Sequence, residues 1–178
     1  MGSGSGLSCA ITLNTALTPE EQRLYQDPRT IQRLLREAKT IAVVGLSTDT
    51  QRASWFVANY LQKEGYRVVP VHPTATELLG ERVYASLTDI PIPIDIVDVF
   101  RPASEAPDLA RQAIAIHARA FWMQLKLANM EAAALAREAG LDVVADRCIK
   151  MEHARYCGRL QCAGMNTEII SARKARLR

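Results

Sequence analysis

The sequence predicts a single-domain α/β protein with a Rossmann-like, doubly wound parallel sheet of five strands and helices on both faces. Short, uninterrupted apolar segments alternate with helix-like segments through most of the chain, and strands buried on both faces have this character. The length of 178 residues suits one compact domain, and we find no internal repeat. With right-handed crossovers, such a sheet binds its ligand at the carboxyl ends of the strands.

The first helix is expected over residues 27–39, because Asp27 is a good N-cap, a proline follows in the first turn, and apolar residues recur with helical spacing. The apolar run 41–44 is the first predicted strand. A second helix is expected over residues 54–64, and Gly65 ends it.

Residues 67–71 form the second predicted strand, which a His-Pro pair breaks. Residues 74–91 are more polar and lack a regular period. We expect a looser segment there, with a turn at Gly80 and a short helical piece near Leu87.

The third predicted strand covers residues 94–100, and a proline after it opens a helix over residues 103–117. The apolar run 120–124 is the fourth strand. An alanine-rich helix over residues 130–139 ends at a glycine, and the fifth strand covers residues 141–145.

Three regions are expected: residues 1–26 as a flexible N-terminal segment, 27–156 as the ligand-binding domain, and 157–178 as a C-terminal extension. The first six residues, rich in glycine and serine, look like a cloning remnant. The extension carries a basic tail, with Arg173, Lys174, Arg176 and Arg178.

The formal net charge is +3, and four cations lie in that tail, so the rest of the chain is close to neutral. This balance does not favour nucleic-acid binding. No apolar run approaches the roughly 18 residues of a membrane span. We expect a cytoplasmic protein that binds a small molecule, and homodimerisation is plausible for an α/β protein of this size.

The cysteines do not have metal-ligand spacing. Cys9, Cys148, Cys157 and Cys162 include no Cys-x-x-Cys pair, so we expect reduced thiols and no zinc site. Cys148 is interpreted as a buried small apolar residue in preference to a reactive thiol.

The segment after the first strand has the character of a phosphate-binding loop. A single glycine, Gly45, precedes a polar stretch with Ser47, Arg52 and Ser54, and a helix follows. Helix N-terminal N–H groups and a loop arginine attract phosphate. The Gly-x-Gly-x-x-Gly fingerprint of dinucleotide-binding domains is absent.

Arg52 lies in the loop after the first predicted strand, and Arg101 and Arg147 follow the third and fifth strands. These three arginines could converge at the carboxyl edge of the sheet. This favours an anionic ligand with several phosphates. The second strand ends in Val71 and a His-Pro pair, without the acid that holds an NAD ribose. NAD is therefore disfavoured, and NADP would need Arg52 or a neighbour for its extra phosphate.

Six segments carry a resemblance to a known family, namely residues 41–54, 69–73, 84–91, 97–101, 122–125 and 144–148. In this order along the chain, they resemble the small stand-alone CoA-binding proteins, whose domain is similar to the CoA-binding domain of the succinyl-CoA synthetase α subunit. The resemblance covers about residues 28–155, and residues 164–167 resemble the ending of that family.

The resemblance implies that coenzyme A or an acyl-CoA binds at the carboxyl ends of the strands. It assigns the phosphates to the first loop and the adenine and ribose to the turn after the second strand. The end of the third strand would border the ligand, and the end of the fourth strand would lie beside the pantetheine arm. The implied ligand-binding residues are Gly45, Leu46, Ser47, Arg52, Ala53, Ser54, Val71, His72, Pro73, Phe100, Arg101, Met123 and Gln124.

Two positions depart from the family pattern. Ala53 stands where relatives often have proline, which should loosen the loop. Lys126 stands where relatives often have glycine, which puts a charged side chain near the pantetheine path.

No catalytic residue is predicted, so binding without catalysis is the preferred interpretation. His72 is expected to line the site, His117 to end a helix, and His153 to lie on the exposed side of a short helix. Asp95 and Asp98 should lie on opposite faces of the third strand, which excludes an acid–base dyad.

The sequence leaves open the role of two residues and two alternative functions. Asp146 and Arg147 either contact the ligand or pair with each other or with neighbouring segments. The alternative functions are an NAD(P)-dependent oxidoreductase and a regulatory module whose basic tail contacts a partner protein.

Overall fold

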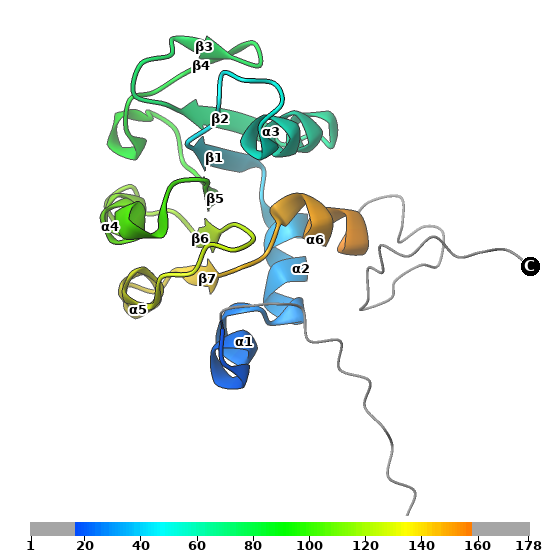
Figure 1. Cartoon of the computed structure of the whole chain (residues 1–178), viewed down its shortest axis with the longest axis vertical. Coiled ribbons are helices and arrows are strands. Elements are labelled where there is room, and N and C mark those ends of the chain that lie inside the picture. Colours follow the sequence, from blue (N-terminus) through cyan, green and yellow to red (C-terminus); the bar gives the residue numbers. More distant parts are fainter. Residues whose placement is uncertain (1–16, 158–178) are drawn as a thin grey trace, which may run out of the picture.

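Five parallel strands form the central sheet, in the order β2-β1-β5-β6-β7 (Figure 1). The structure, a computed structural model, describes residues 17–157. The strands are β1 (Thr40–Val44), β2 (Arg67–Val71), β5 (Ile96–Val99), β6 (Ala120–Met123) and β7 (Asp142–Val144). The predicted fold class and strand order along the chain are confirmed.

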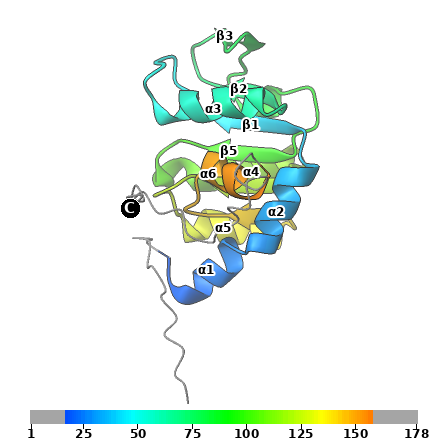
Figure 2. The same ribbon diagram turned by 90° about the vertical axis from the view of Figure 1, so that its right-hand side faces the viewer.

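Helices cover both faces of the sheet, and each face has its own core (Figures 1 and 2). Helices α4 (Ala106–Ala115) and α5 (Met130–Glu138) pack on one face. Helices α2 (Pro28–Glu37), α3 (Ala53–Lys63) and α6 (Ile149–Tyr156) pack on the other. Successive residues of a strand alternate between faces; Phe121 therefore joins the first core and Trp122 the second, both fully buried.

An additional helix, α1 (Pro19–Tyr25), was not predicted. Thr18 and Glu21 form a capping box at its start. Its last residue, Tyr25, is buried, and the Tyr25 carbonyl accepts a hydrogen bond of 3.1 Å from the Ala145 N–H beyond β7. The expectation of a flexible segment up to residue 26 is therefore wrong for residues 19–25, because this helix is held against the edge of the sheet.

The segment between β2 and β5 agrees with the prediction of a turn and a short helical piece. Strands β3 (Glu77–Leu78) and β4 (Glu81–Arg82) form a hairpin around Gly80, whose φ is +74°. A 3₁₀ turn, η1 (Leu87–Asp89), follows.

Most predicted boundaries lie within one or two residues of those in the structure, and two of the differences have an identifiable cause. β5 begins at Ile96 instead of residue 94, because two prolines in residues 91–93 interrupt strand pairing. The predicted helix over 103–117 is a 3₁₀ turn, η2 (Ala103–Glu105), continued by α4, and it ends before His117, whose φ is +54°.

No helix within residues 17–157 has the length and apolar character needed to cross a bilayer. The predicted cloning remnant, Cys9, Cys162, the basic tail and the family-like ending at 164–167 lie outside the described residues.

Candidate functional site

The chain leaves β1 and β5, which are neighbours in the sheet, toward opposite faces. β1 leads into α3 and then β2 on one side, whereas β5 leads into α4 and then β6 on the other. This divergence is the topological switch point of a doubly wound sheet, where ligands bind beyond the strand ends. Gly45 follows β1 there, and Phe100 and Arg101 follow β5.

Gly45 allows these two strand ends to approach closely. Its φ is +83°, which favours glycine, and its N–H donates to the Val71 carbonyl at 3.0 Å. A Cβ atom at this position would lie 2.8 Å from Cδ of Arg101 and 3.2 Å from the Phe100 carbonyl oxygen. The Arg101 side chain therefore lies directly over Gly45.

A pocket of about 200 Å³ opens at this point. Its walls come from the ends of β1 and β2, the start of the β5–α4 connection, α4 and the segment before η1. The lining residues are Val44, Gly45, Val71, His72, Pro73, Ala85, Ser86, Arg101, Glu105, Leu109 and Gln112. Five residues of the predicted site are among them: Gly45, Val71, His72, Pro73 and Arg101.

Sequence reasoning missed the lining residues from α4 and from the segment before η1. Leu109 and Gln112 face the pocket from α4, and the Gln112 side chain also accepts from the Leu87 N–H at 3.2 Å. Helical spacing identifies the inner face of α4, but it does not show that one end of this face borders a pocket.

Arg101 forms a two-bond pair with Glu105. Nε donates to Oε2 at 2.9 Å and Nη2 donates to Oε1 at 2.8 Å. The hydrogen-bonded carboxylate raises the pKa of Arg101 above its usual value. A phosphate at this position would compete with Glu105 for the guanidinium group.

Of the predicted phosphate-binding residues, Gly45 lines the pocket, whereas Ser47, Arg52 and Ser54 lie outside it, in the β1–α3 loop and the first turn of α3. The Ser47 N–H donates to Ser54 Oγ at 3.0 Å, which ties the loop to the first turn of α3. Arg52 is exposed, with Nε 3.8 Å from Oδ2 of Asp49. Leu46 is fully buried in the core, backbone included, so it presents no exposed surface to a ligand in this structure.

His72 stabilises the turn after β2. Its Nδ1 accepts from the N–H of Thr74 at 3.2 Å and of Ala75 at 3.1 Å. A ring nitrogen that accepts two backbone hydrogen bonds is unprotonated. This agrees with a lining role, and it leaves Nε2 as the ring's N–H donor.

At the end of β6, Gln124 is held by a buried carboxyl group. Its Nε2 donates to Oδ1 of Asp98 at 2.7 Å. Asp98 is fully buried, and desolvation raises its pKa to about 8. Met123 and Gln124 do not line the pocket, and the Met123 side chain is fully buried in the core beneath α4 and α5.

The predicted convergence of three arginines is wrong for Arg147. Its Nη2 donates at 2.9 Å to Oε1 of Gln26, so the side chain points toward the α1–α2 junction, where it lines a different pocket. The carboxylate of Asp146 does not pair with it and accepts instead from the Lys126 N–H at 2.6 Å. Both residues pair with neighbouring segments, one of the two alternatives left open by the sequence.

The expectation for His153 is also wrong. This residue is buried, and its Nδ1 lies 3.0 Å from the hydroxyl oxygen of Tyr60, because α6 packs against α3. Cys148 is half-buried, and burial raises the pKa of its thiol, as expected for a packing residue. Asp95 and Asp98 have separate partners, the former accepting from the Thr40 N–H at 3.0 Å.

Comparisons with known proteins found a matching family model and several similar proteins. The family model described as "CoA binding domain" matches residues 39–154. The chain is similar to the uncharacterized protein YneT of Bacillus subtilis, with 43% identity over 124 residues that cover 70% of this chain and 92% of the relative.

Two further similarities were found. A hypothetical protein from Pyrococcus horikoshii has a solved structure with 40% identity and a TM-score of 0.72, covering 74% of this chain and 92% of that one. The ADP-forming acetate–CoA ligase II of Archaeoglobus fulgidus is 29% identical over 73 residues, which are 40% of this chain and only 11% of the ligase.

Proposed function

Because the chain belongs to the CoA-binding domain family, we propose that it binds coenzyme A, free or with an acyl group, at the carboxyl ends of β1, β2 and β5. The observation that carries this proposal is the pocket at the switch point, whose lining includes five residues of the site inferred from the sequence.

The pocket is smaller than the 300–1,000 Å³ usual for whole small-molecule ligands, so at about 200 Å³ it would hold one part of coenzyme A. We assign the adenine and ribose to it, between the His72–Pro73 turn and Leu109. The diphosphate would then lie over the β1–α3 loop, near Ser47 and the exposed Arg52, and the phosphate on the ribose would lie beside Arg101, which lines the same pocket.

The pantetheine arm is assigned to the remaining strand ends. It would pass Phe100 and Arg101 and run toward Gln124, whose amide is fixed by Asp98. Since Nε2 of Gln124 is used by that bond, its Oε1 is the atom left to accept from a pantetheine amide N–H.

Calorimetric titration with coenzyme A, acetyl-CoA, NAD and NADP at moderate salt tests the proposal. We expect saturable micromolar binding of coenzyme A and at least about tenfold weaker binding of NAD and NADP, because the loop after β1 lacks the glycine fingerprint of dinucleotide sites. For NAD, β2 also ends without an acid for the ribose. The ratio of coenzyme A to acetyl-CoA affinity shows whether the thiol end is recognised.

A pair of arginine variants locates the site. Arg101→Gln should weaken coenzyme A binding by about tenfold if the guanidinium bonds a phosphate. Arg111→Gln is the control, since Arg111 also pairs with an acid of its own helix, Asp108 at 2.6 Å, but does not line the pocket. Tighter NADP than coenzyme A binding, or equal effects of the two variants, would contradict the proposal.

A further inference from the structure

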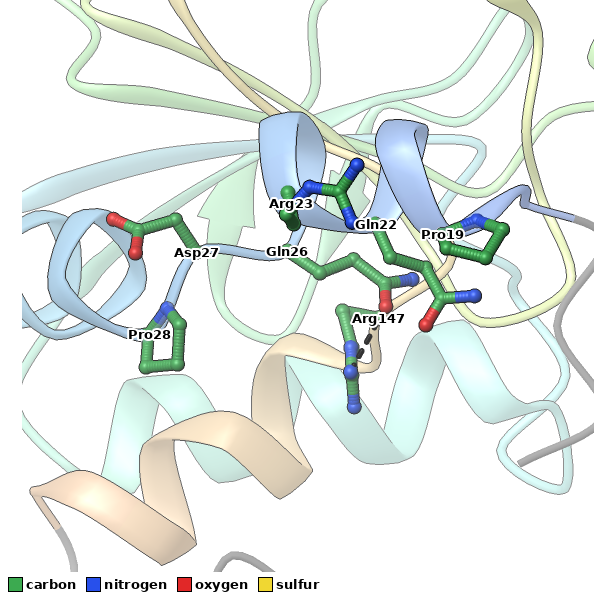
Figure 3. A pocket seen from close by; sticks show the side chains of 7 residues that line it. All are labelled: Pro19, Gln22, Arg23, Gln26, Asp27, Pro28 and Arg147. Carbon is green, nitrogen blue, oxygen red and sulfur yellow. Dashed lines mark hydrogen bonds between the residues drawn. The ribbon is translucent and has the colours of Figure 1, made fainter. Parts of the chain in front are cut away.

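A second pocket, of about 360 Å³, lies beside the edge strand β7, where α1 meets α2 (Figure 3). Its polar lining comes from that junction and from the β7–α6 loop, and consists of Gln22, Arg23, Gln26, Asp27 and Arg147. Two prolines complete the wall. It shares no lining residue with the pocket at the switch point.

The Arg147 guanidinium in this pocket has more donors than partners. Nη2 donates to Gln26, Nη1 is 3.6 Å from Oε1 of Glu152, and the buried Nε has no partner among residues 17–157. Arginine carries five N–H donors in a planar fork that matches a carboxylate. Nε itself is buried, but the side chain as a whole is 22% exposed and lines the pocket, so a ligand can reach the group through its exposed atoms.

Gln26 holds this guanidinium in position. Its side chain is buried, and its Nε2 donates to the Ala145 carbonyl at 3.0 Å, which directs Oε1 toward Arg147. Figure 3 shows the bond between the two side chains. Gln26 is therefore a positioning residue for this pocket.

The charges around Arg147 are unbalanced. Its nearest carboxylate, on the buried Glu152, is also bonded by Arg155 at 3.1 and 3.3 Å, so two largely buried guanidinium groups share one carboxylate. Burial of excess charge is unfavourable, so a bound anion would stabilise this cluster.

The rest of the lining adds to the positive charge. Arg23, which is exposed, lines the pocket from α1 (Figure 3). Asp27 is the one carboxylate in the lining, and its Oδ2 accepts from the N–H and the hydroxyl of Thr30, both at 2.8 Å. Its negative charge is thus directed to the start of α2.

We propose that this pocket binds the carboxylate of a small organic acid, with Arg147 as the principal donor and Arg23 as the second cation. The carboxylate belongs either to a free acid or to the end of an acyl group on coenzyme A. The second source rests on the proposed function. It is geometrically reasonable, because the Arg147 N–H donates to the Met123 carbonyl at 3.4 Å, beside the strand end assigned to the pantetheine arm.

Calorimetry with four probes tests the inference and separates the two sources: glutarate, coenzyme A, glutaryl-CoA and valeryl-CoA, the last two differing by the terminal carboxylate. Saturable glutarate binding identifies a free acid. Glutaryl-CoA binding at least fivefold tighter than valeryl-CoA, without glutarate binding, identifies the acyl source. If neither result is obtained, the inference is overturned. Binding of coenzyme A in that case would leave the proposed function intact.

Variants assign the effect to the pocket. Arg147→Gln and Arg23→Gln should each reduce the carboxylate-dependent binding at least fivefold, whereas Arg137→Gln, which removes an exposed arginine on α5, should not. Circular dichroism would reveal whether Arg147→Gln folds. If it does not, Arg23→Gln still tests the site, because Arg23 is exposed. An equal effect of all three variants would indicate general charge attraction and contradict the site.

Discussion

At the level of single residues, four non-glycine residues within the described range 17–157 have a positive φ, and Lys126 is the most informative. Its φ is +66°, and its N–H is bound by the buried carboxylate of Asp146 at 2.6 Å. The family resemblance of the sequence implies glycine at this position in many relatives, and the left-handed backbone gives a physical reason for such a preference.

Lys126→Gly should therefore stabilise the protein by about 1 kcal/mol, since a left-handed residue with a Cβ costs about 1–2 kcal/mol and glycine gives back part of this in chain entropy. Urea denaturation measures the change. Lys63→Gly, in the last turn of α3, is the control and should destabilise by about 1 kcal/mol. A loss of stability in Lys126→Gly would refute the assigned backbone conformation.

Gly45→Ala should be more harmful than Gly140→Ala. Both glycines have a positive φ, but a Cβ at Gly140 meets nothing within 4 Å, whereas one at Gly45 meets Arg101 and Phe100. We expect both variants to lose about 1 kcal/mol from backbone strain and Gly45→Ala alone to lose coenzyme A affinity. Melting curves and coenzyme A titrations of the two variants provide the comparison. Equal coenzyme A affinities would show that Gly45 is not part of the ligand site.

Asp98 should make the stability depend on pH. Its native pKa is raised to about 8 by burial, so between about pH 4 and 8 the folded protein holds a proton that the unfolded chain releases. Stability contributed by this group is therefore full below pH 4, falls as the pH rises to 8 and is flat above it.

Asp98→Asn should remove that dependence, because asparagine stays neutral and can still accept from Gln124. Melting temperatures at pH 5 and pH 8 measure it: the variant should lose less stability than the parent over this interval. Asp108→Asn, at an exposed position on α4, should behave like the parent. Parallel curves for Asp98→Asn and the parent would show that Asp98 is ionised in the folded protein at pH 5.

At the level of elements, helix α1 is the principal addition to the predicted fold. The pattern Thr18-Pro19-Glu20-Glu21 is a recognisable capping box and could have revealed it. With seven residues it is too short to be stable alone, so its formation depends on contacts with β7 that the local sequence does not contain.

Removal of residues 1–26 should therefore destabilise the domain by about 3 kcal/mol or more, since it exposes the surface that packs against Leu17 and Tyr25. Removal of residues 1–16 alone is the matched control and should change the melting temperature little. Equal melting temperatures for the two truncations would support the predicted start of the domain at residue 27.

For the whole molecule, the sheet and the first pocket were predictable because they depend on local patterns. Apolar runs locate the strands, and the ends of parallel strands meet at one edge, which brought Gly45, His72 and Arg101 together. Side-chain direction was not predictable. Arg147 lies at the expected strand end but turns to Gln26, a partner 121 positions away in the sequence.

The packing of α1 beside β7 also affects whether the edge of the sheet can pair with another chain. An edge strand with free N–H and C=O groups can pair with another copy and start aggregation. Here the Tyr25 carbonyl and the Gln26 side chain bind the backbone of Ala145, at the carboxyl end of that edge. The same short helix that forms the second pocket thus shields this end of the sheet from strand addition, and a chain without it should self-associate more readily as its concentration rises.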